Sequence, residues 1–140
     1  MVLKIREYKD EDKNEVISIW KYIFNYSKQH NDPELIIDMK LSHKDNLFFV
    51  AEENKQLVGT IIAGFDGHRG WLYSLAVIPN KRKQGIGKLL VHKAIVELQK
   101  LGCLKVNLQI INNKDSVVSF YKKLGFSIED RISMGKIIAD

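Results

Sequence analysis

The stretch "KRKQGIGKLL" (residues 81–90) places two glycines in a basic segment that runs directly into an apolar, helix-forming sequence. Glycine lets successive backbone N–H groups turn toward one point without interference from a Cβ atom. The N-terminus of a helix adds unpaired N–H donors and a partial positive charge. This combination predicts a site for an anionic group such as a pyrophosphate, surrounded by the basic residues Lys81, Arg82, Lys83 and Lys88.

The composition predicts one compact soluble domain over residues 1–140, because 45% of the residues are hydrophobic and 28% are charged. The net charge of +5 favours anionic partners, which include nucleic acid, an acidic membrane surface and a phosphorylated small molecule. We expect a cytoplasmic protein, because the N-terminus lacks the apolar run of a secretory signal and no segment approaches about 20 apolar residues. The single cysteine, Cys103, fits a reduced compartment. No metal is expected, because His30, His43 and His92 lack a metal-binding spacing.

The first half of the chain has the periodicity of an antiparallel meander with two helices inserted after the first strand. Alternating or β-rich runs predict strands at residues 2–8, 46–53, 56–66 and 71–77. A helix is expected from the acidic stretch after residue 8 to about residue 25, and a second over 31–43, where Asn-Asp-Pro favours a helix start.

The second half predicts two more helices and up to three more strands. From Gly85 the apolar residues recur at helical spacing until Gly102, and a second helix ends at Gly125 after possible caps in "NNKDS" (112–116). Strands are expected at residues 104–110, 126–132 and 134–138. The predicted fold is therefore mixed α/β, with the order β-α-α-β-β-β-α-β-α-β-β: one mostly antiparallel sheet of six to seven strands and helices on both faces.

Two nucleotide-binding motifs are excluded by the context of the glycines. A dinucleotide fingerprint needs a third glycine where Leu90 stands, and it follows a strand of a parallel sheet. A phosphate-binding P-loop needs Ser or Thr after Gly-Lys, and here Leu89 follows Lys88.

Two segments together resemble the GCN5-related N-acetyltransferase (GNAT) superfamily. The segment "LAVIPNKRKQGIGKLLV" (75–91) carries the family's Arg/Gln-x-x-Gly-x-Gly/Ala loop at Arg82, Gly85 and Gly87. The segment "NNKDSVVSFYKKLGF" (112–126) carries its Tyr-x-x-Leu-Gly-Phe ending from Tyr121. The resemblance covers the whole chain in element order. "NDPE", "FDGHRG" and "SMGK" further resemble a small bacterial branch, the YpeA-like proteins.

The resemblance implies acetyl-coenzyme A as cosubstrate, bound where the fourth and fifth strands splay apart. It implies that the fourth strand hydrogen-bonds the pantetheine arm through its backbone, and that a bulge there frees an N–H for the thioester carbonyl. Tyr121 is implied as the general acid for the departing thiolate; its alternative role is a core tyrosine. The implied cofactor-binding residues are Leu75, Ala76, Val77, Arg82, Lys83, Gln84, Gly85, Ile86, Gly87, Lys88, Asn113 and Tyr121.

Two departures from the family pattern leave the general base open. Gln109 replaces the glutamate of RimI-like members, and Lys114 replaces a frequent asparagine. Asn113 either substitutes for that asparagine or caps a helix, and Glu52 or another strand carboxylate is a candidate base acting through water. His68 and Arg69 are either solvated turn residues or the acceptor-side groups that attract an anionic substrate.

The resemblance implies direct transfer of an acetyl group from acetyl-coenzyme A to a primary amine in a ternary complex, with the acceptor undetermined. A coenzyme A-binding sensor or partner-binding module without catalysis is the alternative. A basic nucleic-acid-binding domain is disfavoured, because the chain has no helix-turn-helix pattern and no aromatic ladder beside the basic residues. We therefore expect acetyl-coenzyme A and an amine as partners, without nucleic acid or membrane, for a monomer or homodimer.

Overall fold

The computed structural model describes residues 2–24, 28–111 and 114–139 of the chain. It forms two compact units, residues 1–107 and residues 108–140, and each is described by itself. Among the described residues, no helix combines the length and the apolar character that crossing a membrane requires.

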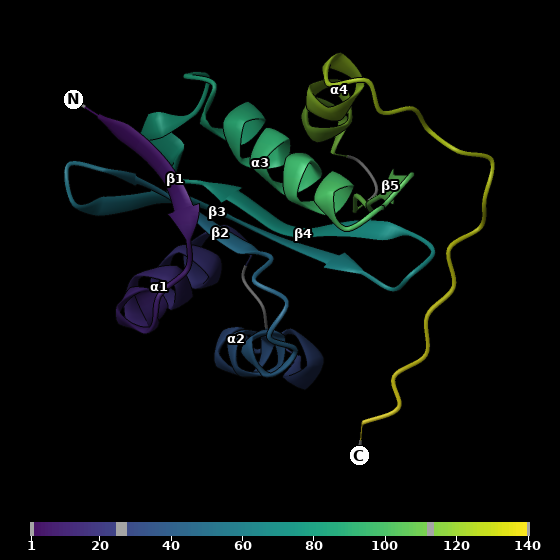
Figure 1. Ribbon diagram of the computed structural model, residues 1–140, viewed down its shortest axis with the longest axis horizontal. Coiled ribbons are helices and arrows are strands. Elements are labelled where there is room, and N and C mark those ends of the chain that lie inside the picture. Colours follow the sequence, from purple (N-terminus) through teal and green to yellow (C-terminus); the bar gives the residue numbers. More distant parts are fainter. Residues whose placement is uncertain (1, 25–27, 112–113, 140) are drawn as a thin grey trace. The chain divides into compact units, whose positions relative to one another are not determined.

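The first unit is built on a single five-stranded sheet with the strand order β1-β2-β3-β4-β5 (Figure 1). The first four strands pair antiparallel in sequence order, and β5 pairs parallel to β4. The β2–β3 and β3–β4 connections are short, as antiparallel strands allow, whereas the parallel β4–β5 pair requires a longer crossover that here contains a helix. The strands are β1 (Leu3–Glu7), β2 (Phe48–Glu53), β3 (Gln56–Phe65), β4 (Gly70–Val77) and β5 (Val106–Asn107).

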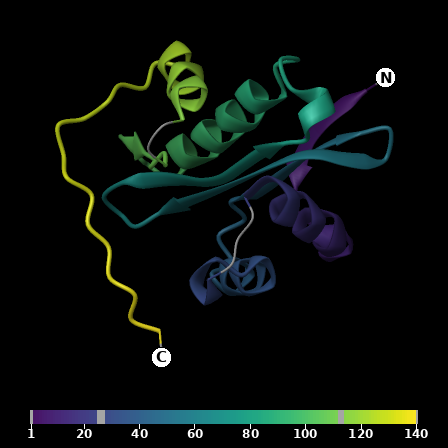
Figure 2. The same cartoon turned by 180° about the vertical axis from the view of Figure 1, so that it is seen from behind.

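Helices cover both faces of this sheet, as the sequence predicts. Helices α1 (Lys13–Phe24) and α2 (Pro33–Ser42) lie on one face, and α3 (Ile86–Lys100) lies on the other, which the reverse view in Figure 2 also shows. The carboxylate of Asp32 caps α2 by accepting the N–H of Leu35 at 3.0 Å, as expected from Asn-Asp-Pro. Short 3-10 turns occupy Asp10–Asp12, Gln29–Asn31 and Pro79–Lys81.

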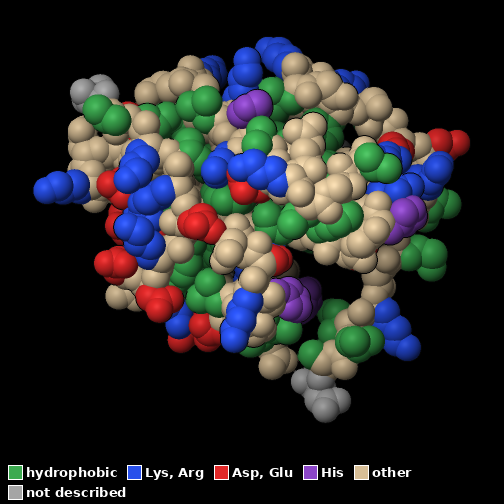
Figure 3. Space-filling view, viewed as in Figure 1, with side chains coloured by type: hydrophobic (Ala, Val, Ile, Leu, Met, Phe, Trp, Pro, Cys, Tyr) green, Lys and Arg blue, Asp and Glu red, His purple; other side chains and the backbone are tan. Residues whose placement is uncertain are grey.

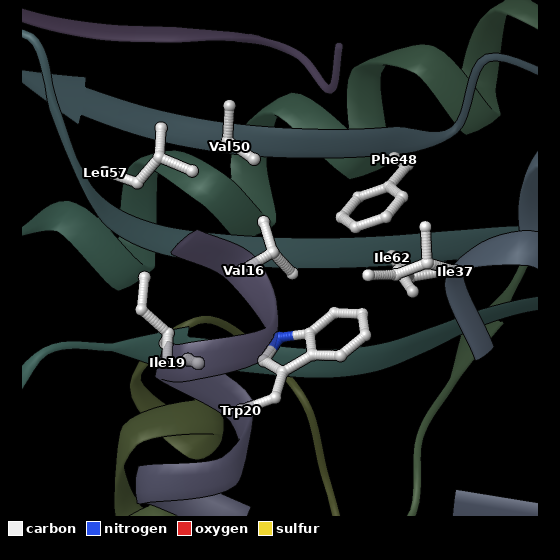
Figure 4. Close-up of a cluster of buried hydrophobic side chains, with 9 residues drawn as sticks. Val16, Ile19, Trp20, Ile37, Phe48, Val50, Leu57 and Ile62 are labelled. Carbon is white, nitrogen blue, oxygen red and sulfur yellow. The ribbon is translucent and has the colours of Figure 1, made fainter. Parts of the chain in front are cut away.

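The hydrophobic core on the α1 face joins that helix to the middle of the sheet (Figure 4). Trp20 is fully buried and its ring stacks on Phe48 with 5.7 Å between the ring centroids. Helical spacing puts the α1 members on one face of the helix, and strand alternation puts Phe48 and Val50 on the face of β2 that meets them. The buried members of the cluster are Val16, Ile19, Trp20, Ile37, Phe48, Val50, Leu57, Ile62 and Ala76.

On the opposite face α3 packs closely on β3 and β4 because Gly59 has no side chain. A Cβ atom added at Gly59 would lie 2.9 Å from the carbonyl oxygen of Ala76 and 2.9 Å from Cδ1 of Leu90. The start of α3 is thereby held against the end of β4. The helix ends as predicted, with Gly102 in the left-handed region at φ 90°.

Positively and negatively charged side chains cover the α1 and β1 part of the face in Figure 3. The Arg6 guanidinium contacts the carboxylate of Asp12 at 2.8 Å and that of Glu52 at 2.7 Å. This cluster ties the start of α1 to β1 and β2. The composition gives the number of charged residues, but it does not show which of them form ion pairs.

The second unit contains helix α4 (Asp115–Lys123), which ends before Gly125 at φ 95°. The expected caps in 112–116 are not found in the described part: Lys114 is the N-cap residue and its side chain makes no capping hydrogen bond. Within this unit the ring of Tyr121 packs edge-on against Phe120 and Phe126, with centroid distances of 5.0 and 5.4 Å.

The final strand pair predicted at 126–132 and 134–138 is absent from the described residues, so the sheet has five strands instead of six or seven. Alternation gives a strand only when the backbone pairs with a neighbour and one face is buried. Ile132 is 90% exposed and Met134 is 91% exposed. The strand predicted at 104–110 is present but shorter than expected, because β5 covers only Val106–Asn107.

Candidate active site

The edge of β4 is paired over only part of its length. β5 pairs with Gly70 and Trp71, and no described strand pairs with β4 beyond Trp71 on that side. The backbone from Leu72 to Val77 therefore presents hydrogen-bonding groups to a ligand that lies alongside as an added strand. Leu75, Ala76 and Val77, predicted from the sequence, all lie on this edge.

A β-bulge interrupts β4 in the middle of this edge. Thr60 pairs with Ala76 and Ile62 pairs with Tyr73, so two residues of β4 oppose one residue of β3. Ser74 is one of the two, and its φ of 54° lies in the left-handed region that favours glycine. A bulge changes the direction of the peptide groups, so the expected donor N–H has a structural basis here.

A buried hydrogen-bonded chain holds the bulge from the α1 side. The Trp20 indole Nε1–H donates to Thr60 Oγ1 at 2.9 Å, and the Thr60 hydroxyl donates to the Ser74 carbonyl at 2.9 Å. Trp20 and Thr60 are both fully buried. The sequence analysis missed all three residues, and a single buried threonine on an apolar strand gives no pattern by which to find it.

The loop after β4 leaves the start of α3 without a side-chain cap. The N-cap is Gly85 at φ 83°, and the first bond of the helix runs from the Leu89 N–H to the Gly85 carbonyl at 3.1 Å. The N–H groups of Ile86, Gly87 and Lys88 precede this bond and have no acceptor within the helix. Lys83, with φ 64°, gives the loop a second left-handed residue. Such a run of amides at a helix start is suited to an anionic group.

Two of the basic side chains of this loop, those of Lys81 and Arg82, have partners within the protein. Arg82 Nε donates to the Val77 carbonyl at 3.0 Å, which joins the loop to the end of β4. Lys81 Nζ lies 2.6 Å from Glu53 Oε1 and is neutralised by it, which the basic run did not reveal. Ile86 is 2% exposed and offers a ligand only its backbone. Lys83, Gln84 and Lys88 are exposed.

Tyr121 lies in the second unit on α4, and its side chain is almost completely buried. Burial raises the pKa of the phenol to about 12, so the hydroxyl carries its proton at neutral pH. A protonated phenol is available as a proton donor, as the sequence expectation requires.

The remaining second-unit candidates have the following positions. Gln109 Nε2 donates to Ser133 Oγ at 2.5 Å. Asn113, predicted to bind the cofactor or to cap a helix, lies outside the described residues.

Three candidate residues of the first unit, Glu52, His68 and Arg69, take part in structural contacts. Glu52 accepts hydrogen bonds from Arg6 and lies on β2, with β3 between it and β4, so we do not assign it the base. His68 and Arg69 form the β3–β4 turn, where the carboxylate of Asp66 accepts their N–H groups at 2.8 and 2.7 Å. These hydrogen bonds place both residues in the turn, and the acceptor-side role of their side chains stays a prediction.

The chain is similar to known acetyltransferases over almost its whole length. It is 37% identical over 134 residues to an acetyltransferase of Yersinia pestis strain Pestoides F, covering 96% of this chain and 94% of the relative. The structure of the PaiA N-acetyltransferase from Thermoplasma acidophilum in complex with coenzyme A is 26% identical, with a TM-score of 0.74 and 94% of each chain covered. Ard1 from Thermoplasma volcanium shares the fold, with a TM-score of 0.81, 24% identity, and coverage of 92% of this chain and 85% of that one.

A sequence model described as the acetyltransferase (GNAT) family matches residues 13–126. The narrower YpeA-like assignment stays a prediction. With a match over most of its length, and with the fold and relatives above, the chain belongs to the acetyltransferase (GNAT) family and is an acyltransferase.

Proposed function

We propose that this chain transfers the acetyl group of acetyl-coenzyme A to a primary amine by direct attack in a ternary complex. The observation that carries this proposal is the continuity of two ligand-binding features in the first unit. The bulged, unpaired edge of β4 runs directly into the loop that leads to the uncapped start of α3. The edge of β4 suits an extended arm that contains amides, and the start of α3 suits a diphosphate.

In this proposal the cofactor is held mainly by the backbone. The pyrophosphate accepts hydrogen bonds from the amides between Arg82 and Lys88, and the pantetheine arm pairs with Leu75, Ala76 and Val77. The coenzyme A-bound PaiA relative supports this choice of cofactor. Asn113 and Tyr121 complete the proposed contacts from the second half of the chain.

The chemistry needs two functions from the protein, which are stabilisation of an oxyanion and protonation of the departing thiolate. The amine attacks in its neutral form, a C–N bond forms, and the C–S bond breaks after an oxyanion has developed on the thioester oxygen. A backbone N–H at the β4 bulge stabilises that oxyanion; such a donor contributes about 3 kcal/mol. Tyr121 gives its proton to the departing thiolate. The proton lost by the amine passes to solvent. Gln109 cannot take up a proton, and Glu52 is paired with Arg6 on β2, with β3 between it and β4.

We further propose that residues 1–140 act as one N-acetyltransferase domain. The family match at 13–126 runs across the boundary between the two compact units, which supports a shared function. We propose a cytoplasmic location and a monomer or homodimer that acts without nucleic acid, membrane or metal.

The test combines binding with turnover. Calorimetry of acetyl-coenzyme A with the full chain is expected to give a 1:1 complex that weakens as salt rises, because the diphosphate is charged. Free thiol release is then measured with small amines, amino acids, polyamines and peptides. Release with at least one acceptor is the expected result. Tight binding without release from any class would favour the sensor alternative, and absence of binding would refute both.

A further inference from the structure

The β4 bulge is a strained feature that the rest of the first unit holds in place. Ser74 has a side chain and yet adopts φ 54°, a conformation that persists only where the surroundings enforce it. The only described side chain that hydrogen-bonds the Ser74 carbonyl is Thr60, which is the single threonine of the sequence.

The direction of the hydrogen bonds in this chain is fixed by chemistry. The indole N–H of Trp20 can only donate, so Thr60 Oγ1 must accept from it. The hydroxyl is then left with its own proton, which it donates to the Ser74 carbonyl at 2.9 Å. Both side chains are fully buried, so water does not compete for either bond. The Thr60 hydroxyl is therefore held in one orientation.

Planarity of the peptide group carries this orientation to the next residue. The Ser74 carbonyl and the Leu75 N–H belong to one peptide unit, and no described peptide bond is cis. In a trans peptide the N–H points opposite to the carbonyl. Because the carbonyl points to Thr60 on β3, the Leu75 N–H points away from Thr60, where no described strand pairs with this part of β4.

We propose that Trp20 and Thr60 are positioning residues for catalysis, because they hold the peptide unit of Ser74 and Leu75 so that the bulge N–H already assigned to the thioester oxygen points away from β3. This inference rests on the proposed function and adds to it the two buried side chains that orient that N–H. Neither side chain touches the cofactor. Their effect is on the polarisation of the acetyl carbonyl and on turnover, and coenzyme A, which lacks that carbonyl, binds independently of them.

The experiment uses the full chain with acetyl-coenzyme A labelled with carbon-13 at the carbonyl, so no acceptor is needed. Infrared difference spectroscopy measures the carbonyl stretch of the bound thioester. In the wild-type chain we expect a shift to lower wavenumber relative to free acetyl-coenzyme A. Thr60→Val, which keeps the shape and removes the hydroxyl, is expected to lose that shift while its affinity for coenzyme A is retained.

Three further variants control for folding. Thr60→Ser keeps the hydroxyl and is expected to restore the shift. Thr60→Cys offers a weaker donor and is expected to give an intermediate shift, which decides the matter if Thr60→Val does not fold. Val50→Ala truncates the buried residue that pairs with Thr60 on β2, so it lowers stability without touching the Ser74 carbonyl and is expected to keep the full shift.

The outcomes separate this inference from the proposed function. A wild-type chain that binds neither coenzyme A nor its acetyl ester refutes the proposed function. A wild-type chain that binds both and shifts the stretch, together with an equal shift in folded Thr60→Val or Thr60→Cys, overturns the positioning role alone. Binding without any shift in the wild type also overturns it. Where an acceptor is found, kcat of Thr60→Val should fall by about 10²-fold with little change in KM for acetyl-coenzyme A.

Discussion

At the scale of single residues, the two halves of the proposed chemistry use different physical means. The donor to the thioester is a backbone N–H, whose direction is set by neighbours. The proton donor, Tyr121, is a side chain whose buried environment raises its pKa to about 12 and keeps it protonated. A phenol in this state changes little between pH 6 and 9, so the alkaline limit of activity is expected to come from other groups.

Replacing Tyr121 with Phe tests its role as acid. The ring contacts with Phe120 and Phe126 are retained, and only the hydroxyl is lost. With the best acceptor, we expect kcat to fall by about 10²-fold or more because the thiolate leaves without a proton donor. The dissociation constant for coenzyme A, measured by calorimetry, should stay the same. Unchanged turnover would remove Tyr121 from the mechanism.

Asp12 is a buried charged residue that stabilises the fold through its contacts with Arg6 and the Lys9 N–H. Burial by itself would raise the pKa of this carboxyl, but the hydrogen bonds from Arg6 and from the Lys9 N–H outweigh burial and hold the pKa below its usual value. A lowered pKa stabilises the fold above the unfolded pKa of about 3.9, and that contribution is lost as the pH falls through the still lower folded pKa.

Asp12→Asn is therefore expected to reduce the free energy of unfolding by about 2 kcal/mol at pH 7. Urea titrations at several pH values measure this difference, which should shrink below about pH 4 as the wild-type carboxyl takes up its proton. Asp38→Asn is a matched control, because the Asp38 carboxylate that pairs with Lys13 is exposed. A difference for Asp12→Asn that persists unchanged at pH 2 would contradict the assignment.

At the scale of elements, the loop between β4 and α3 depends on the left-handed conformation of Gly85. A Cβ atom at this position meets no other atom within 4 Å, so a substitution there acts through backbone strain and not through a clash. Alanine disfavours φ 83°, whereas asparagine tolerates the left-handed region better.

Gly85→Ala is accordingly expected to lower the free energy of unfolding by about 1 kcal/mol and to weaken coenzyme A binding, while Gly85→Asn should retain more of both. Calorimetry and thermal denaturation measure the two effects. The control is Gly67→Ala in the β3–β4 turn, which has a similar φ of 92° and equally open surroundings but lies at the other end of β4. Equal loss of binding in the two alanine variants would show that the loop amides do not hold the ligand.

Most of the helices and strands could be predicted from the sequence, but several contacts between them could not. Apolar spacing predicted β1, α1 and α3, β-rich runs predicted β2 to β4, and the Asn-Asp-Pro start predicted α2, and all of these elements are found. The same signal failed at 126–138, where alternating residues have no pairing partner among the described strands. The loop at 81–88 was predicted as a binding site from its glycines, and that role stays a prediction. Thr60, Trp20 and Glu53 were not found, because their roles depend on which strand lies opposite, and that information is not local in the sequence.

At the scale of the whole molecule, the proposal of a single domain makes a thermodynamic prediction. The two compact units, residues 1–107 and 108–140, should unfold together if the second unit contributes to the same site. Differential scanning calorimetry is expected to give one transition, with calorimetric and van't Hoff enthalpies in agreement. Coenzyme A should raise its midpoint, because it binds only the folded state. Two separate transitions, with only the first shifted by coenzyme A, would contradict the proposal.

The short parallel pairing of β5 has a further consequence for handling the protein in solution. An incompletely paired strand has free backbone groups that can pair with a strand of another chain. Natural proteins usually prevent such pairing with charged residues or proline. Here the run of β4 that no described strand pairs with on this side is "LYSLAV" (72–77), which contains neither a charged residue nor a proline. In the proposed complex coenzyme A covers this edge, so light scattering on concentrated samples should show less self-association when coenzyme A is present.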